Sequence, residues 1–510
     1  MPEDRENQRL AGARLRRRLP AVAIAAVALV VRLPWLSSPG FMPDQTQFVS
    51  WSVLSHSPDG MAAVYAPRGS QGRPACNYPP VGVYLLKGLG GIYETLSPSS
   101  QGLDPALEQA IAHGNRTPAT RRAAILFKLP AVLADALLGS LLFVFLAARA
   151  PLKTAAVVAG CYVLLPAVIY DSAVWGQVDA LPTLLVIVSL ELARRGKLGW
   201  MVAVATLALL TKAQTAAMLP MWFGVAMCWT VRPAGQMTSR PAAQGKGPAR
   251  SVRRRAAKLP AIQRPALRRM VGRGLILLAT AGLVAIVVLF PFRHVLSGVW
   301  RAYAGAASYY PFTHLNGFSA WFLSAPLTEP HLRSVPLTDW YVSDSTSVLF
   351  GLSPRLWGLI GVLAVWGLVL EMLWRRRCDD RSLRWAARTL PLAFFVLSTQ
   401  MHERYLFPAL AVWAWSFLPS RRWWLCWLTI GAAATINMIW AWPGPGKSAW
   451  VTMATETLHR NWLSLPPGVW CSGALIVVLG LSTFGWIDGL SWRETRTPSK
   501  SNTGTSPSSP

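Results

Sequence analysis

The feature that most constrains this chain is a series of long apolar runs, which few kinds of fold can accommodate. Four clear examples cover residues 20–36, 126–148, 275–290 and 469–484. At about 1.5 Å of rise per residue, each run as a helix covers most of a hydrocarbon core about 30 Å thick. Backbone groups in lipid must pair internally, so we expect these runs to be helices. With 53% hydrophobic and 14% charged residues, the composition indicates a membrane protein rather than a soluble domain.

The basic residues indicate how the chain is oriented in the membrane. A net charge of +28 spread over an exposed domain would suggest a nucleic-acid partner, but here the charge is concentrated. Segment 232–273 carries twelve Lys or Arg and no Asp or Glu, whereas the long loops at 38–122 and 293–345 are close to balanced. Basic segments stay in the cytoplasm, so the balanced loops are expected outside. The distribution of charge therefore indicates which segments face the cytoplasm, and no nucleic-acid partner is predicted.

Lys and Arg as inside markers predict twelve transmembrane helices, with both termini in the cytoplasm. Residues 1–19 read as the basic flank of a retained membrane anchor, 20–487 as one polytopic domain, and 488–510 as a disordered tail. The expected outer loops are 38–122, 292–354 and 442–467, and the first contains an interfacial helix at 78–96. The expected spans are 20–37, 123–148, 154–171, 178–193, 198–213, 216–231, 274–291, 355–374, 387–402, 405–419, 423–441 and 468–487.

Polar side chains gather at the expected outer ends of four separate segments. Each ionisable group near bilayer depth calls for a partner or a role, because burying it costs several kcal/mol, although capping or snorkelling explains many such residues. Asp135 lies deeper and is expected to pair with Lys128 or Lys212; a structural role and a functional role for it are equally open. Arg32 is expected to snorkel outward. The gathered residues are Asp44 and Gln47; Asp171, Trp175, Gln177 and Asp179; Lys212 and Gln214; and His402, Glu403 and Arg404.

Taken in order, these motifs resemble the GT-C class of glycosyltransferases. The likeness is to bacterial relatives of the dolichyl-phosphate-glucose glucosyltransferases and to polyprenyl-phosphate mannosyltransferases, and it covers most of residues 20–440. Segment 309–323 looks like the family's aromatic and asparagine-bearing loop. The motifs that carry the resemblance are Asp44 with Phe48 and Trp51, Tyr78-Pro79-Pro80, Asp135, Trp175-Gly176-Gln177-Val178-Asp179, Lys212-Ala213-Gln214 and Met401-His402-Glu403-Arg404-Tyr405.

The resemblance implies an all-α, GT-C-like bundle that transfers a hexose, mannose or glucose, from a polyprenyl-phosphate donor to an acceptor hydroxyl. The expected location is the outer face of the plasma membrane, and the acceptor is a glycolipid, a polysaccharide or a protein. Asp44 would be the general base, and His402, Arg404 and Lys212 would bind the donor phosphate. Glu403 is expected to orient His402 or Arg404. The supporting residues are Gln47, Trp51, Tyr78, Asp135, Trp175, Gln177, Asp179, Gln214 and Glu403.

Neither a cofactor nor a metal ion is predicted, because few acidic residues accompany Asp44. Two alternatives stay open: a flippase or transporter for a lipid-linked sugar, and an oligosaccharide polymerase or ligase. Transporters usually place their charges near the bilayer midplane in paired broken helices, whereas the charges here group at the outer surface. This grouping favours the transferase.

Overall fold

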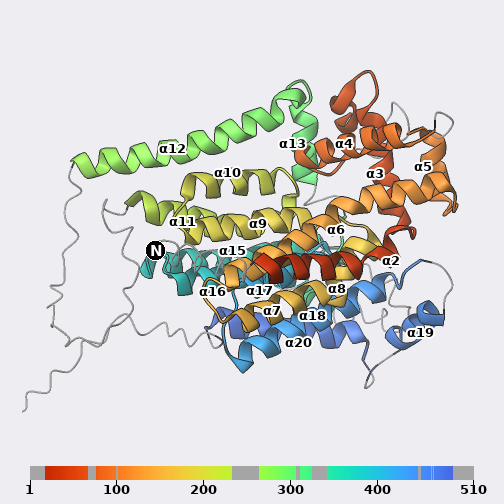
Figure 1. Ribbon diagram of the computed structural model, residues 1–510. Coiled ribbons are helices and arrows are strands. Elements are labelled where there is room, and N and C mark those ends of the chain that lie inside the picture. Colours follow the sequence, from red (N-terminus) through yellow and green to blue (C-terminus); the bar gives the residue numbers. More distant parts are fainter. Residues whose placement is uncertain are drawn as a thin grey trace, which may run out of the picture.

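The helices of this protein lie side by side in one elongated bundle (Figure 1). The computed structural model describes residues 18–66, 76–98, 102–231, 264–305, 310–323, 342–348, 350–445, 449–460, 462, 465–485 and 487. Most of the expected basic N-terminus, most of the basic loop and the expected tail therefore lie outside the described residues. Figure 1 shows α3, α4 and α5 gathered at one end of the bundle.

Helix is present in every stretch expected to cross the membrane. The first stretch holds a helix over Arg18–Val30 and the short α2 (Leu33–Leu36). The others hold α6 (Pro118–Leu146), α7 (Leu152–Leu164) with α8 (Pro166–Ile169), α9 (Ala180–Arg194), α10 (Leu198–Leu209), α11 (Leu219–Val231), α12 (Arg264–Leu289), α15 (Pro354–Arg375), α16 (Asp380–Leu397), α17 (Phe407–Trp415), α18 (Arg421–Ala441) and α20 (Pro467–Thr483).

By length and composition, four helices of the described chain are able to cross a membrane, and one bent pair would make a fifth. The four are α6, α12, α15 and α18. These apolar helices support the prediction of an all-α membrane protein, while the number of twelve crossings stays a prediction. Because α12 already begins at Arg264, the end of the expected basic loop is helical.

The expected outer loops contain short helices of their own. The first loop holds α3 (Met42–Ser55), the 3₁₀ turn η1 (Gly60–Tyr65), α4 (Pro80–Leu96) and α5 (Pro105–Ala112). A helix therefore occupies the segment that was predicted to be interfacial. The second loop holds η4 (Phe290–Phe292) and α13 (Leu296–Gly305), and the third holds α19 (Ala449–Leu458).

The span expected over 154–171 is broken, so the prediction of one continuous helix is wrong there. Helix α7 and the following helical segment meet at an angle of 53°. Pro166 begins the second piece, and its missing N–H interrupts the hydrogen-bond ladder. Helix α8 then runs into a π-helix, η2 (Tyr170–Trp175), and ends at Gly176. Such π-helical turns occur frequently at functional sites.

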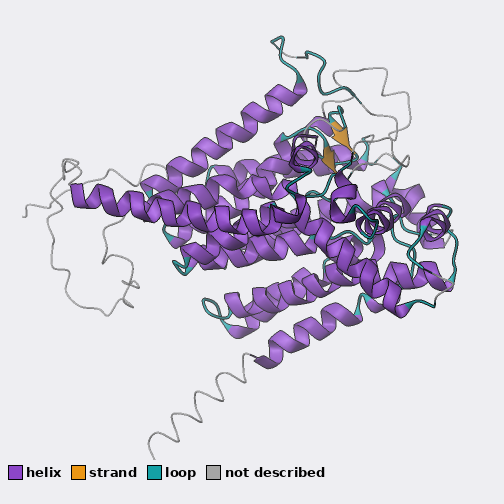
Figure 2. Ribbon diagram, turned by 90° about the horizontal axis from the view of Figure 1, so that it is seen from above, coloured by secondary structure: helices purple, strands orange, loops and turns teal. Residues whose placement is uncertain are grey.

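Two hydrophobic clusters meet where the π-helix ends. The larger one fills the bundle and includes Trp175 and Trp413. The smaller one packs under α3, η1 and α4 and includes Phe48, Trp51 and Val178. Segment 175–178 thus passes from one cluster to the other, and its backbone is held from both sides. Figure 2 shows two short strands toward the end of the bundle that carries α3, α4 and α5. They are β1 (His314–Leu315) and β2 (Met401–His402), which pair in parallel.

Candidate active site

Asp44 stands in the first turn of α3, which follows the first apolar run. Pro43 occupies an early helix position where its missing N–H is tolerated, and the carboxylate of Asp44 is favoured by the positive end of the helix dipole. The backbone N–H of Phe41 donates to the carbonyl of Trp175 over 2.9 Å. The start of α3 is therefore fastened to the segment that follows the π-helix.

One carboxylate oxygen of Asp44 accepts two hydrogen bonds from that segment. Trp175 Nε1 donates to Asp44 Oδ2 over 2.7 Å, and Gln177 Nε2 donates to the same oxygen over 2.5 Å. The hydroxyl of Tyr78 donates to Gln177 Oε1 over 2.9 Å, which sets the amide so that its NH₂ faces Asp44. Burial, Asp179 and Asp44 raise the pKa of Tyr78 well above its usual value, so its hydroxyl stays a donor.

The backbone that carries Gln177 requires a glycine. Gly176 has φ of +87°, in the left-handed region, and a Cβ at this position would lie 2.6 Å from Gln45 Nε2. Gln45 Nε2 in turn donates to the Gly176 carbonyl over 2.9 Å. The N–H groups of Gly176 and Gln177 both donate to the carbonyl of Asp171, which closes the turn. The motif that was read from the sequence is thus one compact loop facing Asp44.

A second carboxylate, Asp179, is fully buried and joins two more of the expected segments. The ammonium of Lys212 forms an ion pair with Asp179 Oδ1, and Gln214 Nε2 donates to the same oxygen over 3.0 Å. Arg404 Nε lies 3.9 Å from Asp179 Oδ2. Lys212 also lies over the rings of Tyr78 and Tyr405, with 5.5 and 5.8 Å from its nitrogen to the ring centres. Buried charges of opposite sign are therefore matched here.

The segment from Met401 to Tyr405 is fixed by pairing with a distant strand. In the β1–β2 pair, His314 is in register with Met401 and Leu315 with His402. Part of the aromatic segment 309–323 therefore lies directly against this motif. Glu403 Oε1 accepts a hydrogen bond of 2.6 Å from Arg404 Nη1.

The local charges set the protonation of this segment. Burial is the largest single influence on Glu403 and would raise its pKa, but Arg404 and His402 together outweigh burial and hold that pKa at about 2. Burial, together with Arg404, lowers the pKa of His402 below its usual value, so its imidazole is neutral at pH 7. Burial opposes the charge of Arg404, but Asp44 and Glu403 raise its pKa well above the usual value.

Arg404 and Asp44 lie against the same tryptophan. The guanidinium carbon of Arg404 lies 5.8 Å from the centre of the Trp175 ring, whose Nε1 binds Asp44. Arg404 Nε and Asp179 Oδ2 are buried and have no hydrogen-bond partner among the described residues. All four polar segments predicted from the sequence therefore meet at one site.

Trp51 and Gln47, two of the predicted supporting residues, lie outside the hydrogen-bonded cluster. Trp51 packs against Tyr78 with ring centres 5.4 Å apart, behind the hydrogen-bonded residues. Gln47 is half-buried on α3 and makes no hydrogen bond to this cluster in the described part of the chain. Their positions assign a packing role to Trp51 and no defined role to Gln47.

The expected partners of Asp135 were wrong, and so was the expectation that Arg32 snorkels. Arg32 is fully buried, and its Nε and Nη2 each lie 3.2 Å from Asp135 Oδ2. Lys128 instead donates to backbone carbonyls, including those of Ser38 and Ala173 at 2.8 Å. The turn after residue 30 directs Arg32 inward, where an uncompensated Asp135 charge would be costly.

Sequence reasoning missed three residues of this site. Tyr405 packs against His402 and Lys212, and Gln45 donates a hydrogen bond to the Gly176 carbonyl. Each of the two directly follows a predicted site residue in the sequence, and this adjacency was the available signal. Asp171 was noted in the sequence but not assigned to the site. It is fully buried, both of its carboxylate oxygens lack a hydrogen-bond partner among the described residues, and the charges of Asp179 and Lys212 act on it.

The opposite end of the bundle has a different character. Helix α9 begins after Asp179 and runs for 15 residues, or about 22 Å, to Arg194. There Glu191 accepts hydrogen bonds from Arg194 and Arg195, and Arg149 donates to the Trp415 carbonyl. Three arginines, Arg149, Arg194 and Arg195, therefore gather around Glu191 at this end.

No family profile matches this chain, and no curated protein matches it significantly. Among the described residues, no group of three or more His, Cys, Asp or Glu side chains is arranged to hold a metal ion. The absence of a metal or cofactor stays a prediction. The function of the site is therefore inferred from its own chemistry.

Proposed function

We propose that this protein transfers a hexose, mannose or glucose, from a polyprenyl-phosphate donor to an acceptor hydroxyl, with inversion at the anomeric carbon. The observation that carries this proposal is the setting of Asp44. Its Oδ2 is held by Trp175 and Gln177, whereas its Oδ1 accepts no hydrogen bond from the described residues. The side chain is half-buried at the edge of the site, so an acceptor can approach the open oxygen.

One carboxylate is sufficient for this reaction. The acceptor oxygen forms a bond to the anomeric carbon while the bond from that carbon to the phosphate oxygen breaks. The acceptor proton passes to Asp44 Oδ1, and the polyprenyl phosphate leaves with the electron pair of the broken bond. Because the phosphate is a stable anion, it needs no general acid, unlike the sugar alkoxide that leaves in glycoside hydrolysis.

Arg404 and Lys212 supply positive charge for the departing phosphate. Arg404 uses Nη1 to bind Glu403, and its Nε faces Asp179 Oδ2 at 3.9 Å, which leaves its remaining N–H groups for an incoming anion. Lys212 is held by Asp179, so it acts as a fixed charge more than as a mobile ligand. His402 is neutral and would contribute a hydrogen bond. Charges fixed before the reaction stabilise a growing negative charge without reorganisation.

The proposed location is the plasma membrane, with the site on the outer face and both termini in the cytoplasm. Support comes from the arginine-rich end of α9 and α17, which lies opposite the Asp44 end and matches the positive-inside rule. The acceptor is proposed to be a glycolipid, a polysaccharide or a protein.

The decisive experiment supplies purified protein in liposomes with labelled polyprenyl-phosphate mannose or glucose and a mixture of cell-envelope acceptors. We expect one donor to be consumed, its sugar to appear on an acceptor, and free polyprenyl phosphate to accumulate. Consumption of neither donor would refute the hexosyl assignment. Equal consumption by the Asp44→Asn variant would refute Asp44 as the base.

A flippase for a lipid-linked sugar is the second candidate, and two observations favour it. The 53° break between α7 and α8 resembles the discontinuous helices of transporters, and Asp171 is buried beside it without a hydrogen-bond partner in the described chain. A liposome assay without acceptor separates the two functions. A flippase moves labelled polyprenyl-phosphate sugar across the bilayer with the sugar–phosphate bond intact, whereas a transferase without acceptor leaves its distribution unchanged.

A further inference from the structure

A cavity of about 1500 Å³ lies beside the start of α3, outside the ionic site. Its walls come from the starts of α3 and α6, from α8, and from α18 with the segment that follows it. Asp44, Asp179, Lys212 and Arg404 do not line it. Its volume exceeds the roughly 300–1,000 Å³ typical of pockets for small molecules, so a larger ligand is indicated.

The deeper walls of the cavity are apolar. Ile125 and Phe127 contribute from α6, Ile169 from α8, Ile439 from α18 and Val451 from α19. Hydrocarbon chains are the ligand parts that gain most from leaving water for such a surface.

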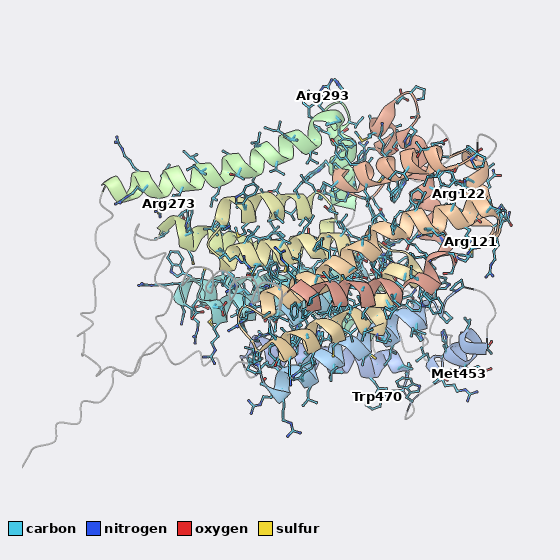
Figure 3. All side chains as sticks on the ribbon, in the orientation of Figure 1. Arg121, Arg122, Arg273, Arg293, Met453 and Trp470 are labelled. Atoms are coloured by element: carbon cyan, nitrogen blue, oxygen red, sulfur yellow. The ribbon has the colours of Figure 1, made fainter. Side chains whose placement is uncertain are left out.

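The mouth of the cavity is positively charged. Its lining includes three arginines, Arg116, Arg121 and Arg122, and no Asp or Glu. Arg122 is already engaged, because its Nη1 donates to Ser97 Oγ over 2.7 Å. Arg116 and Arg121 are exposed, and no hydrogen bond or ion pair holds their side chains within the described chain. Figure 3 shows Arg121 and Arg122 at the α5 end of the bundle, near the start of α6, whose helix dipole adds positive potential.

A wall of close contacts separates this cavity from Asp44. Gln45 lines the cavity and donates to the Gly176 carbonyl, and Phe41 binds the Trp175 carbonyl through its backbone N–H. The rings of Phe41 and Trp175 have centres 4.5 Å apart. An occupant would therefore not reach the carboxylate of Asp44 without displacing these residues, which indicates a ligand that stays outside the ionic site.

We infer that this cavity binds an anionic glycerophospholipid of the surrounding bilayer. The acyl chains lie against the apolar walls, and the phosphate lies between Arg116 and Arg121. Arginine near an anionic headgroup contributes attraction that a zwitterionic headgroup, with its own positive charge, largely cancels. This inference does not depend on the proposed transferase activity.

The test is native mass spectrometry of the full-length protein in detergent with equal amounts of phosphatidylglycerol and phosphatidylcholine. We expect the wild type to retain phosphatidylglycerol preferentially. In the Arg116→Gln/Arg121→Gln variant this preference should fall about twenty-five-fold, at about fivefold for each arginine. The matched control is Arg293→Gln/Arg301→Gln, which removes two exposed arginines that do not line the cavity and should leave the preference unchanged. Figure 3 shows Arg293 in a different part of the molecule.

Three results would overturn the inference. They are equal retention of both lipids by the wild type, an unchanged preference in the double arginine variant, and displacement of phosphatidylglycerol by equimolar polyprenyl phosphate, which would assign the cavity to the donor. A second variant, Ile439→Trp, narrows the apolar wall without altering charge and should lower retention of both lipids. If the arginine variant fails to fold, unchanged retention by Ile439→Trp refutes the site independently.

Discussion

The Asp44→Asn variant tests the proposed base with little disturbance of the fold. Both hydrogen-bond donors, Trp175 Nε1 and Gln177 Nε2, bind the same carboxylate oxygen, Oδ2. An asparagine can place its carbonyl oxygen there and keep both bonds. Its NH₂ group then takes the position of Oδ1, which accepts no hydrogen bond from the described residues. The substitution therefore removes the proton acceptor and preserves the contacts.

The expected size of the effect follows from this geometry. General-base catalysis contributes about 10²–10⁴ in rate, so kcat should fall by two to four orders of magnitude, or about 2.7–5.4 kcal/mol in the activation free energy. The KM for the donor should change little, because the proposed phosphate ligands, Arg404 and Lys212, are untouched. The melting temperature should stay close to that of the wild type, because both hydrogen bonds persist.

The assay measures labelled hexose transfer in liposomes at saturating donor, together with thermal unfolding in detergent. The matched control is Asp59→Asn, the same chemical change at an exposed residue between α3 and η1, which should retain full activity. Transfer by Asp44→Asn within a factor of ten of the wild type would refute the reasoning. A loss of activity accompanied by a large fall in melting temperature would show that Asp44 is structural.

Three further predictions concern the charges around the site. Arg404→Ala should raise the KM for the donor about ten- to hundredfold with little change for the acceptor, since it removes a charge-assisted contact to phosphate; equal effects on both would contradict this role. Glu403 has its pKa lowered from 4.5 to about 2, so its stabilising contribution is complete above pH 4.5 and is lost as the pH falls towards 2. The difference in melting temperature between wild type and Glu403→Gln should therefore shrink over that interval, and a constant difference would argue against the ion pair. Arg32→Met should lower the free energy of unfolding by about 3–5 kcal/mol, because it leaves the buried charge of Asp135 unpaired. The double variant Arg32→Met/Asp135→Leu should recover most of this loss in thermal unfolding. Additive losses from the two substitutions would exclude the pairing.

The sequence predicted the helices and the identity of most site residues. Apolar runs become helices because the backbone must pair internally in lipid, a requirement that depends only on local composition. The segments containing Asp44, Trp175, Lys212 and Arg404 stood out because polar groups interrupted otherwise apolar stretches. Such signals are local, so they survive without knowledge of packing.

The tertiary structure alone decided which of these groups contact one another. Arg32 binds Asp135 across a separation of 103 positions, so the expected pairing of Asp135 with a lysine was wrong. The 53° break at Pro166, the shared carboxylate oxygen of Asp44 and the arginine-lined cavity likewise depend on how distant helices pack. A buried charge is satisfied by whichever partner the packing brings within hydrogen-bond distance. The hydropathy pattern along the chain does not determine that distance.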